Sequence, residues 1–260
     1  MYNILKYSFF DQLRSRWSLA YALFYAAATT ILVYLSADIS KVAVSLMNLV
    51  LILTPLTGTL FGMMQYYNSR EFLELLLAQP VRRGSVFLGM YLGIALSLCL
   101  SMLAGVSLPL AISGELFSGK ASAFFSLMFS AVFLTLIFTG ISFTTALYNE
   151  NRLRGFGLSI LIWLLLVFVY DGVFLTLFLV FEDYPLERFA LAGTLLNPVD
   201  LARVLILLEL DLSAIMGYSG AVFKRFFGTG AGMAISASAL LLWSLVPLLL
   251  MLIKGSRKDF

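Results

Sequence analysis

The sequence predicts an all-α membrane protein of six transmembrane helices, folded as a single transmembrane domain over residues 1–260. Of its 260 residues 61% are hydrophobic and 12% are charged, and the mean hydropathy of +0.98 lies outside the range of soluble domains. Six apolar runs are long enough to cross about 30 Å of hydrocarbon. They lie near residues 17–37, 42–66, 85–112, 121–147, 156–181 and 231–253.

The first segment, residues 1–16, predicts an amphipathic helix at the membrane interface. The side chains expected on its apolar side are Tyr2, Leu5, Phe9, Phe10 and Leu13. Those expected to face water are Lys6, Asp11, Arg14 and Arg16.

A polar island at residues 68–84 separates the second and third apolar runs, and its pattern predicts a short helix lying across the membrane surface. Arg70, Glu71 and Glu74 share a narrow polar face, and leucines fill most of the rest. Pro80 ends the helix, because the residue before a proline is pushed out of the α region. A short surface helix of this kind is typical of a membrane protein that binds a partner protein on that side.

Two further connections stand out. Residues 148–155 form a turn too short for more than one helical turn. Residues 182–230 form a long segment that we expect to fold as helical hairpins pressed against the outer membrane face. Within it Asn197 is a helix N-cap, Pro198 takes the first helical position, and Asp200 adds an acid to the first turn. Asp200 and Arg203, three residues apart, are spaced to pair on one helix face.

Lysine and arginine predict the orientation. Eleven of the seventeen fall on the side that holds both termini and six on the other. The positive-inside rule therefore places both termini in the cytoplasm of a multi-pass protein of the bacterial inner membrane.

Several classes of site are excluded by what the chain lacks. It has no histidine and one cysteine, Cys99, which argues against His-ligated zinc, a Ser-His nucleophile and thiolate clusters. The run 114–120 resembles a phosphate-binding loop, but Ala121 stands where the magnesium-binding Ser or Thr belongs and no strand precedes it. We therefore expect no catalytic residue, no metal site and no cofactor bound by this chain.

Two polar residues within the apolar runs are candidates for a translocation path. Asp171 is the one ionisable residue deep in a run, where an acid is costly unless it faces protein or water. Tilt of the helix would alternatively place Asp171 near the outer headgroups. Asn48 is equally open to interpretation as a hydrogen bond between helices.

The order of these elements resembles the type-2 ABC exporter permeases. The string from Ser69 to Gly84 is similar to the first coupling-helix region of that family, and Leu196 to Arg203 is similar to a motif of its NosY-like branch. That branch supplies the membrane subunit for nitrous oxide reductase maturation. The resemblance implies a dimer that is not itself an enzyme, driven by two cytoplasmic ATPase subunits that hold ATP and Mg.

The resemblance also implies roles for residues. The ATPase-coupling candidates are Arg70, Glu71, Glu74, Leu76, Gln79, Arg82, Asn149, Glu150 and Arg152. The candidates for a periplasmic gate or partner seat are Asn197, Pro198, Asp200 and Arg203. The implied cargo is a copper or sulfur species passed to a periplasmic acceptor. The alternatives are a lipid, polysaccharide or drug exporter of the same family, an ion-coupled secondary transporter using Asp171, and a membrane scaffold.

Overall fold

The computed structural model describes residues 2–36, 38–77, 83–117, 121–181, 187–210 and 230–257, and every element within those ranges is a helix. Six helical stretches are long and apolar enough to span a membrane, which confirms the predicted fold class. They are α2 (Arg16–Leu35), α3 (Ile39–Asn68), α5 (Arg83–Ile112), α6 (Ala121–Tyr148), the stretch Arg152–Leu177, and most of α12 (Gly230–Arg257).

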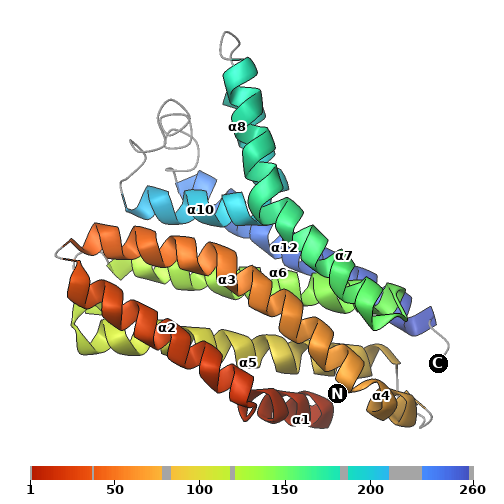
Figure 1. Ribbon diagram of the computed structural model, residues 1–260. Coiled ribbons are helices and arrows are strands. Elements are labelled where there is room, and N and C mark those ends of the chain that lie inside the picture. The colour runs from red at the N-terminus through yellow and green to blue at the C-terminus, as the bar shows by residue number, and fades with distance from the viewer. Residues whose placement is uncertain are drawn as a thin grey trace.

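Helices α5 and α6 form the centre of the bundle. In their most apolar stretches 72% and 61% of residues are buried, against 6% in Arg152–Leu177. α6 packs against α3 and α12, and α5 packs against α2 and against the N-terminal helix α1 (Tyr2–Leu13) (Figure 1). Small residues allow these close approaches. At Gly105 of α5, for example, an added Cβ would lie 2.6 Å from the Ala22 carbonyl oxygen of α2.

The helix α1 packs on the bundle through small polar residues. It follows the first half of α5 and meets α2 at a bend (Figure 1). Its buried residues are the polar Ser8 and Gln12, and Tyr2 and Phe10 of the predicted apolar side are exposed. The reason is Gly93 of α5, which brings the two backbones so close that only a small side chain such as Ser8 fits between them. The charged residues are exposed, as predicted: Lys6, Asp11, Arg14 and Arg16.

The fifth span is kinked. It consists of α7 (Arg152–Leu164), a π-helical turn η2 (Leu165–Val169) and α8 (Tyr170–Val180), and α8 leaves the bundle at an angle (Figure 1). A π-turn inserts one residue into the helical ladder, which is a recognised cause of such kinks. The turn predicted at 148–155 is shorter in the structure, because α7 already begins at Arg152.

Two helices, α9 (Glu187–Leu196) and α10 (Pro198–Glu209), form a hairpin whose tip reaches into the bundle. At the tip the Trp243 indole donates to the Leu195 carbonyl, 3.1 Å away, and the Asn197 amide donates to the Leu166 carbonyl at 2.8 Å. Leu166 and Trp243 lie near the middle of the fifth and sixth spans. The expectation that this part of residues 182–230 is pressed against the outer membrane face is therefore wrong. The remainder, 182–186 and 211–229, lies outside the described residues.

Candidate functional site

One end of the bundle gathers α1, the short helix α4 (Arg70–Leu77), the turn between α6 and α7, and the end of α12 (Figure 1). Three contacts join these segments. The Tyr67 hydroxyl donates to the Asn149 carbonyl at 2.7 Å, the Tyr7 and Phe72 rings lie 5.6 Å apart, and the Lys254 ammonium lies 4.9 Å from the Tyr148 ring. Segments distant in sequence thus form one continuous surface.

The helix α4 is anchored by one side chain and exposes a mixed face. Leu73 is fully buried, and the Leu73 amide donates to the Ser69 carbonyl at 2.8 Å. Glu71 is exposed, and so are Phe72 (41%) and Leu75 (70%). Two exposed large apolar side chains beside an acid are typical of a surface that a partner covers.

The other predicted coupling residues on this segment are less exposed or lie outside the described residues. Arg70 and Leu76 are half-buried rather than exposed. Glu74 belongs to α4, but its side chain lies outside the described residues, as do Gln79, Arg82 and the rest of residues 78–82.

The second cluster of coupling candidates forms the turn that follows α6. The Asn149 side chain donates to the Thr145 carbonyl at 2.9 Å, and the Arg152 guanidinium lies 5.6 Å from the Phe156 ring. Glu150 and Arg152 are exposed. Because the turn is also bonded to Tyr67 at the end of α3, a displacement of α4 would reach the fifth span.

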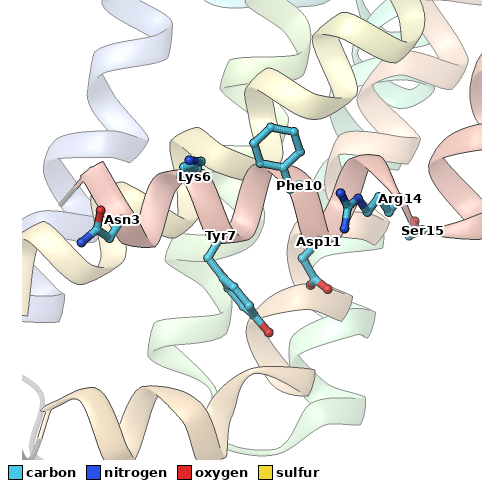
Figure 2. Close-up of a pocket in the computed structure, with 7 residues that line it drawn as sticks. All are labelled: Asn3, Lys6, Tyr7, Phe10, Asp11, Arg14 and Ser15. Carbon is cyan, nitrogen blue, oxygen red and sulfur yellow. The ribbon is translucent and has the colours of Figure 1, made fainter.

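Figure 2 shows the groove along α1 that borders this surface. It is lined by Asn3, Lys6, Tyr7, Phe10, Asp11, Arg14 and Ser15 and encloses about 880 Å³. The Asp11 carboxylate accepts from the Gln65 amide at 3.0 Å, which ties α1 to α3. Helix α1 therefore belongs to this surface.

The second site is a polar cluster where α8 meets α10, defined here as Asp171, Asn197, Asp200 and Arg203. The Arg203 Nη1 lies 2.6 Å from Asp171 Oδ2 and 3.0 Å from Asp200 Oδ1. The Asn197 amide nitrogen lies 3.2 Å from Asp200 Oδ2. The pairing of Asp200 with Arg203 is as predicted. The pairing of Asp171 with Arg203 was not anticipated.

The kink of the fifth span and the hairpin tip fit together at this cluster. Asn197 caps α10 by accepting from the Val199 amide at 3.0 Å, and its own amide donates to Leu166 within the π-turn. The Tyr170 hydroxyl donates to the Gly193 carbonyl at 2.7 Å. Pro198, at the first position of α10, is buried. The Asn197 side chain thus caps α10 and also donates a hydrogen bond to a carbonyl of the fifth span.

Asp200 lies on α10, outside the six spans, and burial is the largest influence on the pKa of its carboxyl group. Burial raises the pKa of Asp200 to about 8, and the neighbouring Asp171 carboxylate adds to this effect. The Arg203 guanidinium and the Asn197 amide act in the opposite direction.

Asn48 does not join the cluster. It is exposed on the outside of α3. The interpretation that it makes a hydrogen bond between helices of one copy is not supported. Within the described residues no group of three or more His, Cys, Asp or Glu side chains could hold a metal ion.

We expect replacement of Asn197 with alanine to destabilise the protein more than replacement of Asn151, the cap of α7. Loss of an N-cap costs about 1 kcal/mol, and loss of the hydrogen bond to the part-buried Leu166 carbonyl costs about 0.5–1.5 kcal/mol more. Asn151 is exposed and bonds the Leu153 and Arg154 amides, so water can replace it. Thermal unfolding of the two purified variants compares these costs. Equal shifts would mean that the Leu166 bond contributes nothing.

No family model matches the chain. It is 28% identical over 270 aligned residues to a probable ABC transporter permease protein NosY of Stutzerimonas stutzeri, covering 96% of this chain and 95% of that protein. A protein of the same description from Pseudomonas aeruginosa is 27% identical over 233 residues, covering 84% of this chain and 85% of the relative. Six apolar helices and two relatives that match over most of their length support a multi-pass membrane protein that is similar to NosY permeases of ABC transporters.

Proposed function

We propose that the chain is the membrane subunit of an ATP-driven exporter and that separate ATPase subunits dock on the α4 end of the bundle. The observation that carries this is the face of α4 on which Glu71, Phe72 and Leu75 are exposed while Leu73 is buried in the core. The permease relatives support a subunit that works with ABC ATPases. ATP and Mg would be held by those partners, and this chain would not be an enzyme by itself.

The contacts of α4 suggest how movement would pass into the membrane. α4 lies between α3 and α5 in the chain, and Tyr67 at the end of α3 holds the turn after α6. Closure of the ATPases on ATP would push α4 and, through Tyr67 and Asn149, shift the start of the fifth span. A rigid link of this kind transmits displacement because packed interfaces are poorly compressible.

A second copy of the chain is the proposed partner within the membrane. Asn48 is exposed on α3, and an amide facing lipid is costly. The fifth span is almost unburied in one copy, and Trp163 of α7 bonds the Ile52 carbonyl of α3, so the two helices share one face. A homodimer formed on that face would enclose Asn48 in a central path, with the polar cluster of Asp171 beside its outer gate.

The cargo and the acceptor follow from the resemblance to the NosY-like branch. We infer a copper or sulfur species exported for nitrous oxide reductase maturation and received by a periplasmic protein. The proposed orientation places both termini in the cytoplasm, because eleven of the seventeen Lys and Arg residues fall on the α4 side.

Reversal of two charges tests the docking surface. The Glu71→Lys/Glu74→Lys variant is expected to lose co-purification with the ATPase subunits and transport, because the substituted side chains would repel basic residues of the partner. The membrane fold should be unchanged. Glu115→Lys, at the opposite end, is the matched control and should retain both. A double variant that still binds its ATPase and transports normally would exclude α4 as the transmission element.

Cysteine labelling tests the orientation. In a Cys99→Ala background, Ser113→Cys should react with a membrane-impermeant thiol reagent from outside intact cells and Glu150→Cys should not. Both positions are exposed at the ends of their helices, so access depends on the side of the membrane. Labelling of Glu150→Cys from outside would reverse the orientation and with it the placement of the ATPases.

A further inference from the structure

The polar cluster contains more acid than base. A single nitrogen, Arg203 Nη1, contacts both Asp171 and Asp200, at 2.6 and 3.0 Å. One guanidinium balances one carboxylate, so the cluster would carry a net charge of −1 if both acids were ionised. Two carboxylates that share a site do not both ionise readily, because each raises the free energy of the other's charged form.

Within the part of the chain that the structure describes, the elements packed around the cluster supply no second cation. α6 has no charged residue, and the basic residues of α12, Lys254 and Arg257, lie at its far end. α3 has only Lys41, in its first turn, and the charges of α9 lie in its own first turn, far from the hairpin tip. The neighbouring polar groups are occupied, since Tyr170 donates to Gly193 and Asn197 donates to Asp200 and Leu166.

We propose that this cluster is a proton-binding site and that a proton held by Asp200, beside Arg203 and Asp171, latches the α9–α10 hairpin to the kinked fifth span. With the proton in place the cluster is neutral. When the proton leaves to water, the two carboxylates repel each other across Arg203 in apolar surroundings, and α10 is held less firmly against α8. The neutral bonds from Asn197 and Tyr170 remain, so the hairpin loosens without detaching.

The direction of the pH dependence follows from whether the folded or the unfolded chain binds the proton more tightly. An aspartic acid in the unfolded chain loses its proton near pH 4, whereas burial raises the pKa of Asp200 to about 8. The stability contributed by the latch is therefore complete below about pH 4 and is lost as the pH rises toward about 8. The inference involves neither the cargo nor the ATPases, so it can fail while the proposed transport function stands.

Thermal unfolding of the purified chain in lipid nanodiscs, from about pH 6 to about pH 9, tests the latch. We expect the unfolding midpoint of the wild type to fall across this range and that of Asp200→Asn to stay level, because the amide imitates the protonated acid. Asp171→Asn leaves one acid for one guanidinium, so its unfolding midpoint should also stay level with pH. This variant supplies the test if Asp200→Asn does not fold. The matched control Glu209→Gln, on the same helix outside the cluster, should follow the wild type.

Infrared spectroscopy detects the bound proton itself. A purely structural role of the two acids would not produce the absorption band of a protonated carboxyl group. At neutral pH the wild type should show the carbonyl stretch of a protonated carboxylic acid, and both asparagine variants should lack it. Parallel pH profiles for wild type and Asp200→Asn would overturn the proposal. So would a wild-type spectrum without the protonated-acid band.

Discussion

Replacement of Arg203 with glutamine is expected to be among the most destabilising single substitutions in the protein, apart from those in the apolar contacts between helices. The change would leave Asp171 and Asp200 facing each other without the cation that now contacts both. Removing one partner of a buried ion pair costs about 3–5 kcal/mol. Because about 30% of the Arg203 side chain is exposed, we expect the lower end of that range, about 3 kcal/mol.

The measurement is thermal or denaturant unfolding of the purified variant in a mild detergent, at a pH near neutrality. Two further variants separate charge from shape. Arg203→Lys keeps the cation and should recover part of the loss. The double variant Arg203→Gln/Asp171→Asn removes one unbalanced acid and should be more stable than Arg203→Gln alone. An Arg203→Gln protein as stable as the wild type would show that water already compensates the two acids.

Replacement of Gly105 with leucine is expected to separate α2 from α5. A Cβ at this position would lie 2.6 Å from the Ala22 carbonyl oxygen and 2.8 Å from Tyr25 Cβ, so the helices must move apart. Overpacking of a tight contact costs about 1–3 kcal/mol. We expect the upper part of that range, because the nearest obstacle is backbone. The shift would also disturb the Tyr25 hydroxyl, which bonds Thr54 of α3 at 2.9 Å.

Gly157 of α7 offers a matched control, because a Cβ added there meets nothing within 4 Å. Gly157→Leu should leave the unfolding temperature and the yield of folded protein near wild-type values, while Gly105→Leu lowers both. If the two leucine variants behave alike, close packing of α2 on α5 is not a determinant of stability.

The sequence alone determined the number and rough limits of the spans, because a bilayer demands long apolar helices and composition reports them directly. It also determined the local signals at α10. The N-cap Asn197, the proline at the first helical position and the Asp200–Arg203 pair are all present in the structure. Such features depend on residues within one turn of each other, so neighbours in the chain suffice to predict them.

Only the tertiary structure decided which faces pack and which charges meet. The wheel of α1 predicted an apolar side but no contact with the bundle, and it is Gly93 on a different helix that makes Ser8 the contact residue. Asp171 and Arg203 are separated by 32 residues, and a π-turn together with a hairpin that enters the bundle brings them to 2.6 Å. Hydropathy cannot foresee such contacts, because among apolar helices the arrangement is set by shape complementarity and by a few polar groups that must find partners.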